Sequence, residues 1–199
     1  MTGVASDGRR LRISTTLAGS IAAAGGSALL AIVLHPVVAS AAYAWTLTAL
    51  LAAAAAVPVG IDLRSRKLPN RWVAPIAAAA AVQAFAIAYG TADPWRVLWP
   101  LIVAAIVFAF YVALGLAGMF GLGDAKFAAA LSITAAIYAG PLALYLIPIA
   151  VLLGGLWRAL LTAVGRGKRP RAHGPAIAIA ALTILVTTIA LQQAAGALR

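Results

Sequence analysis

Two aspartates are the residues of this chain best placed to do chemistry. Asp62 stands between an apolar stretch and a basic one, and Asp124 closes the glycine-rich run Gly-Leu-Gly-Asp at 121–124. The chain of 199 residues has only four acidic residues and no glutamate. A carboxyl group at the edge of the hydrocarbon is costly, which makes it a functional candidate. Two carboxyls that meet can share one proton, so that one activates water while the other polarises a carbonyl. The pair therefore suggests an aspartyl protease working inside the membrane.

The elements that must position these acids are membrane helices. The chain is 64% hydrophobic and 10% charged, whereas a soluble domain has about a quarter charged residues. Its apolar segments are continuous and alanine-rich, without the alternation of barrel strands. The sequence predicts an all-α polytopic membrane bundle of about seven transmembrane helices. The expected spans are 16–34, 38–60, 73–90, 96–117, 125–139, 141–161 and 174–195.

The distribution of basic residues predicts the orientation of these spans. With the N-terminus in the cytoplasm, the basic clusters at 9–12, 64–71 and 158–171 all fall inside. Asp62 and Asp124 then share the cytoplasmic side, and Asp93 falls outside. The formal charge of +11 is interpreted as contact with the anionic headgroups of the lipid bilayer, so no nucleic-acid partner is expected.

Gly140-Pro141 is expected to separate the fifth span from the sixth, and Gly174-Pro175 to open the last. Three segments are predicted: a cytoplasmic tail at 1–15, an additional transmembrane helix at 16–37, and a catalytic membrane domain at 38–195. The chain has no cysteine, which excludes disulfides and thiolate metal sites, and no metal or cofactor is expected. Its histidines, His35 and His173, are interpreted as interface residues.

Residues around the two acids form the expected substrate-binding site. Pro69 fixes a turn, and Asn70 is interpreted as the N-cap of the third span. Gly121 and Gly123 leave space beside Asp124 for an extended substrate peptide. Lys126 is counted with this site and is interpreted as extending to the headgroups.

Each acid also has a purely structural interpretation, which the sequence leaves open. Asp62 could pair with Arg64 or Arg66 in the headgroup region. Asp124 could act as the N-cap of the fifth span, a role that does not exclude catalysis.

Together the two motifs resemble the type IV prepilin peptidase family. The matching features are an aspartate followed by a basic stretch and Leu-Pro-Asn at 62–70, Gly-x-Gly-Asp-x-Lys at 121–126, and the late Gly-Pro at 174–175. The resemblance covers residues 40–195. It implies an aspartic endopeptidase, with Asp62 and Asp124 catalytic, that cleaves prepilin or pseudopilin leaders at the cytoplasmic face of the inner membrane. Larger members add a cysteine-bearing loop that this chain lacks, so it looks like the short peptidases of Flp-type pili, and methyl transfer is not implied.

Other functions remain open from the sequence. The Gly-x-Gly-Asp signature also occurs in proteases of the presenilin kind, which usually carry Tyr-Asp where this chain has Ile61-Asp62. A small membrane transporter or channel would use intramembrane acids, although here both acids lie on one face. An inactive scaffold of a pilus-assembly machine is a further alternative. The sequence does not decide which prepilin is the substrate, or whether the chain forms a homo-oligomer.

Overall fold

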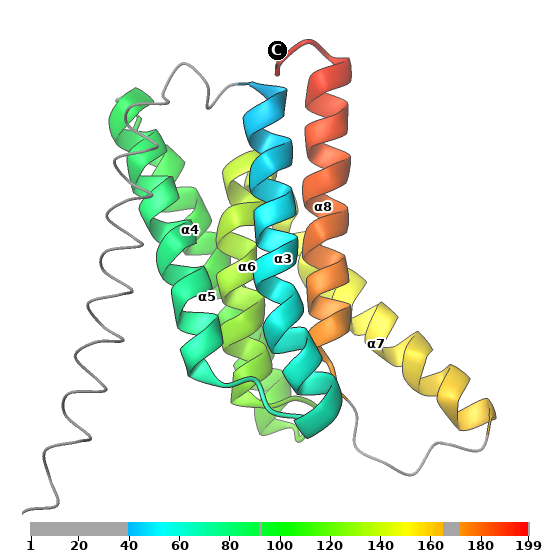
Figure 1. Ribbon diagram of the computed structural model, residues 1–199. Coiled ribbons are helices and arrows are strands. Elements are labelled where there is room, and N and C mark those ends of the chain that lie inside the picture. The colour runs from blue at the N-terminus through cyan, green and yellow to red at the C-terminus, as the bar shows by residue number, and fades with distance from the viewer. Residues whose placement is uncertain (1–39, 92, 165–171, 199) are drawn as a thin grey trace, which may run out of the picture.

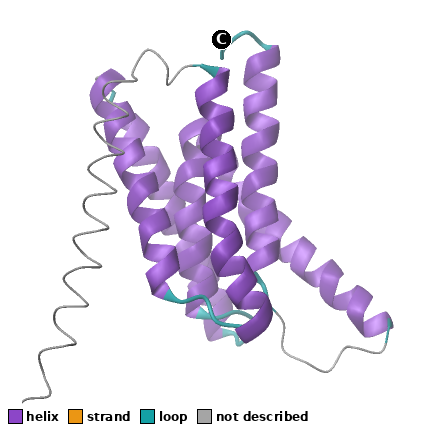
Figure 2. Ribbon diagram, in the orientation of Figure 1, coloured by secondary structure: helices purple, strands orange, loops and turns teal. Residues whose placement is uncertain are grey.

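The fold of the protein is all-helical in the part of the chain that the structure describes. The structure, a computed structural model, describes residues 40–91, 93–164 and 172–198. Within them Figure 2 shows helices and loops and no strand. In chain order the elements are α3 (Ala41–Ser65), α4 (Asn70–Thr91), α5 (Trp95–Leu116), α6 (Leu122–Ala139), the 3-10 helix η1 (Gly140–Tyr145), α7 (Leu146–Ala163) and α8 (Gly174–Ala194).

Five stretches of the described chain are long and apolar enough to cross a membrane. They are α3, residues 70–89 of α4, α5, the continuous stretch from α6 to α7, and α8. The protein is therefore a multi-pass membrane protein. The predicted tail at 1–15 and the first helix at 16–37 lie outside the described residues, so the total of about seven helices and the cytoplasmic N-terminus stay predictions.

The helices that carry the two acids are longer than the sequence predicts. The span expected at 38–60 continues to Ser65, and the one expected from 125 begins at Leu122. Asp62 and Asp124 therefore lie within helices and not beside them. The boundaries were placed where hydrophobicity ends, but a helix can continue into the polar interface, where water and headgroups solvate its side chains. α3 ends at Ser65, and its C-cap Arg66 has the left-handed φ of 54° and donates its N–H to the carbonyl of Asp62 at 2.8 Å.

The break predicted at Gly140-Pro141 is a sharp helical turn in the structure. α6 ends at Ala139, Gly140 has a φ of 55°, and Pro141 lies in the first turn of η1. Glycine adopts this left-handed region without the steric cost that a side chain would bring. Figure 1 shows that α7 then leaves the bundle obliquely while α6 stays within it.

Helix α6 is the centre of the bundle. It packs against α4, α5 and α8, and most of its residues are buried. Many of these are alanines, which allow helix backbones to approach closely in a membrane, where there is no water to drive association. Helix α8 packs against both α6 and α3. It therefore bridges the helices that carry Asp124 and Asp62.

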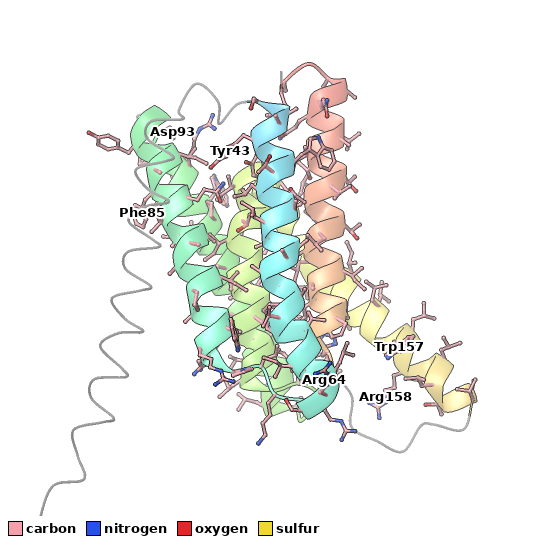
Figure 3. All side chains as sticks on the ribbon, in the orientation of Figure 1. Tyr43, Arg64, Phe85, Asp93, Trp157 and Arg158 are labelled. Carbon is pink, nitrogen blue, oxygen red and sulfur yellow. The ribbon has the colours of Figure 1, made fainter. Side chains whose placement is uncertain are left out.

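The bundle has two chemically distinct ends. Figure 3 places Arg64 at one end and Asp93 at the other. At the Asp93 end, this carboxylate accepts a hydrogen bond from the N–H of Trp95 at 3.0 Å and pairs with Arg96 at 3.5 Å. At the Arg64 end, α3 and α5 finish while α4, α6 and α8 begin (Figure 1). Both motif aspartates lie at this second end, as predicted.

Candidate active site

The carboxyl group of Asp62 is buried and held by the first turn of α8. Asp62 is only 4% exposed, and its Oδ2 atom accepts a hydrogen bond from the backbone N–H of Gly174 at 2.8 Å. A Cβ atom at Gly174 would lie 2.8 Å from that same oxygen, closer than atoms can pack. Glycine at this position therefore lets the helix start reach the carboxylate.

The pairing of Asp62 with neighbouring arginines is not seen. In the described part of the chain, Arg64 and Arg66 are exposed and neither forms an ion pair with Asp62. Asp62 lies on the buried face of α3, whereas Arg64 points toward the outside of the bundle end (Figure 3). The carboxyl group is thus directed inward to the start of α8.

Asp124 is held by the start of its own helix. It is the third residue of α6, half-buried, and its Oδ2 atom accepts from the N–H of Gly121 at 2.9 Å. The N-cap of α6 is Gly121, three residues before Asp124, so the interpretation of Asp124 as the N-cap is wrong. Its side chain instead reaches back to the N-cap N–H, as an acid at the third position of a helix commonly does.

The two carboxyl groups lie at the same end of the bundle, each in a hydrogen bond to a backbone N–H. Each acid also faces the first turn of a helix, α8 for Asp62 and α6 for Asp124. Helix starts carry unpaired N–H groups and partial positive charge, and they therefore stabilise anions. The arrangement combines a buried carboxyl with a half-buried one.

The two sequence motifs pack directly against each other at a glycine. A Cβ atom on Gly123 would lie 3.0 Å from the Cβ of Leu68 and 3.3 Å from its carbonyl oxygen. Leu68 is buried and precedes Pro69 in the loop from α3 to α4. In this structure the space beside Gly123 is therefore occupied by Leu68. A role of Gly121 and Gly123 in binding an extended substrate stays a prediction.

A hydrogen bond joins the other ends of the same motifs. The Nζ atom of Lys126 donates to Oδ1 of Asn70 at 3.2 Å, and both side chains are exposed. Asn70 is the first residue of α4 in the structure, one position inside the helix from the N-cap role expected for it. The substrate-binding role of Lys126, Asn70 and Pro69 stays a prediction.

An apolar groove of about 420 Å³ begins at this pair and runs between α4, α5 and α6. Its polar end is formed by Asn70 and Lys126, and apolar side chains line the rest. These include Val73, Ala77, Phe108 and Ile133. The groove therefore joins a polar mouth at the motif end of the bundle to an apolar interior.

A histidine that the sequence assigns to the interface is instead buried at this site. His173 is 7% exposed, and its Nε2 atom lies 3.3 Å from the hydroxyl of Tyr111. Its ring stacks on Phe120, with centroids 4.1 Å apart and planes 27° from parallel. Burial lowers the pKa of His173 to about 4, because an imidazolium loses its hydration there. The interface interpretation of His173 is therefore wrong, and that of His35 lies outside the described residues.

The sequence carries little signal for this aromatic cluster. Tyr111 and Phe120 are ordinary members of an apolar stretch, and only the fold shows that they meet His173. The one available hint was that His173 immediately precedes Gly174-Pro175.

One comparison with known proteins finds a relationship. Residues 45–159 match the model of the type IV leader peptidase family. The matched segment includes both aspartate motifs and ends before His173 and Gly174. Among curated proteins and among solved structures, no match to the chain was found.

Proposed function

Because the chain belongs to the type IV leader peptidase family, we propose that it is an aspartic endopeptidase of prepilin leaders. It cleaves the leader peptide of type IV or Flp-type prepilins at the cytoplasmic face of the membrane. Asp62 and Asp124 are its catalytic residues. Membership of the family identifies the protein as a leader-peptidase-like protease. The aspartic mechanism, the prepilin substrate and the cytoplasmic side of cleavage are what we propose in addition.

The observation that carries this proposal is the convergence of the two carboxyls. Asp62 and Asp124 come from different helices, yet both lie at one end of the bundle, and each accepts a hydrogen bond from the backbone N–H of a helix start. Neighbouring carboxyls do not both ionise readily, so the pair holds one proton between them. The pair then titrates as a coupled unit.

The reaction is hydrolysis by an activated water. The ionised carboxyl takes a proton from water as the oxygen attacks the scissile carbonyl carbon, and the protonated carboxyl donates its proton to the carbonyl oxygen. Collapse of the tetrahedral intermediate breaks the C–N bond: one hydroxyl of the intermediate returns a proton to the carboxylate that gave one, and the amine leaves with the proton taken from water, so the pair is regenerated. The half-buried position of Asp124 supports water entry from the bundle end.

The groove supports a particular placement of the substrate. Its mouth at Asn70 and Lys126 is polar and its interior is apolar. The apolar helix of a prepilin then lies along the spans, while the polar leader stays in water beyond the bundle end. This placement brings the junction of leader and helix to the carboxyl pair.

The alternatives have less support in the described residues. A pathway for ions would need polar groups along the length of the bundle, whereas both motif aspartates lie at one end of it. An inactive scaffold would not require the backbone donors that hold each carboxyl.

The direct test is co-expression of the full chain with candidate prepilins from the same genome. Loss of the leader, seen as a faster-migrating prepilin with a new N-terminus, is the expected result. The purified chain should process the same prepilin in detergent. If no prepilin is shortened and liposomes containing the chain instead conduct cations, the transporter or channel function takes the place of this proposal.

A further inference from the structure

Each carboxyl of the pair is held by a glycine N–H that directly follows an aromatic residue. Gly174, which holds Asp62, follows His173, and Gly121, which holds Asp124, follows Phe120. The rings of His173 and Phe120 are the ones that stack at 4.1 Å. A single side-chain contact therefore connects the two peptides that hold the two carboxyls.

The imidazole of His173 is fixed from several sides. Tyr111 on α5 places its hydroxyl 3.3 Å from Nε2, and its own ring lies 5.8 Å from the imidazole. On α7, a Cβ at Gly154 would lie 2.6 Å from Nδ1 and 2.7 Å from Cε1 of His173. Gly154 therefore leaves the space that the imidazole fills.

Phe120 is fixed by the same group. Its ring lies 5.5 Å from that of Tyr111, so the three rings form one cluster between α5, the turn before α6 and the start of α8. None of them reaches the carboxyls through its side chain in a hydrogen bond that the structure describes.

We propose that the stacked rings of His173 and Phe120, braced by Tyr111, are positioning residues that set the separation of the two catalytic carboxyls. The cluster fixes the distance between the N–H groups of Gly174 and Gly121, and these fix Asp62 and Asp124. The inference rests on the proposed function, and it extends the site to His173, which lies beyond the segment that matches the family. Proton sharing requires the carboxyls at one spacing, and the stacked rings connect the two helix starts that hold them.

The test is steady-state cleavage of a prepilin by the full chain, purified in detergent, with kcat and KM measured separately. His173→Ala and Phe120→Leu should each lower kcat by about tenfold to a hundredfold, the range expected for misplaced catalytic groups. KM should change little, because the proposed groove is untouched. Phe120→Tyr, which keeps a ring for stacking, should restore most of the rate.

The double variant His173→Ala/Phe120→Leu should be no slower than the slower single variant, because both changes remove one contact. Tyr111→Phe removes only the hydroxyl and should cause a smaller loss of kcat. Trp157→Ala is the matched control, since this aromatic side chain lies on α7 (Figure 3), is 54% exposed and forms no ring contact with the cluster in the described residues. Its kcat should equal that of the wild type.

The pH–rate profile separates positioning from simple loss of folded enzyme. Fewer folded molecules lower the rate equally at every pH, whereas carboxyls that move apart interact less, so the two limbs of the profile move toward each other. The titratable groups around the cluster are Tyr111 on α5, Asp62 on α3 and Asp124 on α6. On α7 the residue that faces His173 is Gly154, which does not titrate. These groups remain in His173→Ala and Phe120→Leu.

A wild-type kcat in His173→Ala would overturn the inference, and so would a reduced rate with an unmoved profile. If His173→Ala does not yield folded protein, Phe120→Leu and Tyr111→Phe are judged by the same two readouts. Failure of the proposed function looks different. In that case wild-type protein does not cleave, or Asn replacements of the two aspartates still do.

Discussion

The side-chain ammonium of Lys126 donates a hydrogen bond to the amide oxygen of Asn70, 3.2 Å away, and joins the starts of α6 and α4. Together with the contact of Gly123 against Leu68, it makes one structural unit of two motifs that are distant in sequence. The two motifs therefore hold each other in place through these contacts, without a bound substrate.

Replacement of either of the two proposed catalytic aspartates should abolish cleavage. Asp62→Asn and Asp124→Asn remove the carboxylate that takes or gives the proton while preserving shape, and each should lower kcat by about 10³-fold or more. The measurement is loss of the prepilin leader in membranes containing matched amounts of each protein. Asp93→Asn, at the opposite end of the bundle, is the control and should cleave normally. Near-normal cleavage by either site variant would remove the carboxyl pair from the mechanism.

Loss of the Lys126–Asn70 hydrogen bond should have a modest effect. The bond is exposed to solvent, so it contributes about 1 kcal/mol and its loss lowers kcat/KM by less than about tenfold. Lys126→Met and Asn70→Ala should therefore show similar small losses, and the double variant should be no worse than either. A hundredfold loss in Lys126→Met alone would instead indicate that this ammonium contacts the substrate.

A side chain at Gly123 should disrupt the packing of the two motifs. Its Cβ would lie 3.0 Å from the Cβ of Leu68, so Gly123→Val should lower stability by about 1–3 kcal/mol and greatly reduce cleavage. Thermal unfolding in detergent and prepilin cleavage measure the two effects. Gly123→Ala adds a smaller side chain at the same contact and should cause smaller losses of both. A Gly123→Val variant that is as stable as the wild type but inactive would indicate crowding of the substrate peptide.

Gly174→Ala should displace the carboxyl of Asp62. The new methyl group would lie 2.8 Å from Oδ2, so the carboxyl or the start of α8 must move, and a kcat loss of about a hundredfold is expected. Gly155→Ala is the matched control, because this helical glycine of α7 has no atom within 4 Å of the added Cβ. The control should retain activity. Equal activity in the two variants would show that the Gly174–Asp62 contact is dispensable.

The stability of the protein should depend on pH through His173. Its pKa is about 4 when folded, against about 6.5 in the unfolded chain, so the unfolded state binds the proton first as the pH falls. Above pH 6.5 His173 is neutral in both the folded and the unfolded state, so its burial costs no stability there. As the pH falls from 6.5 to 4 the unfolded state binds the proton, and the free energy of unfolding falls by about 3 kcal/mol. Melting curves of wild type and His173→Gln in detergent check this. The two aspartates remain in both proteins, so a wild-type decline no steeper than that of His173→Gln over this window would contradict the prediction.

Part of this site could be read from the sequence because its signals are local. The apolar spans, the Gly-Pro break before α7 and the shared end of Asp62 and Asp124 follow from hydropathy, proline chemistry and the distribution of arginine and lysine. Helix ends were less predictable, since Asp62 and Asp124 lie within helices that continue past the apolar residues. The partners of His173 could not be foreseen, because aromatic residues on separate helices meet only through packing.

The hydrogen bond between Gly174 and Asp62 indicates how much of the chain the proposed active site needs. The segment that matches the family stops at residue 159 and carries both signature motifs. A gene fragment cut at that point would look complete by its motifs, yet it would lack α8 and the donor that holds Asp62. Any minimal version of the protein must therefore keep its last helix.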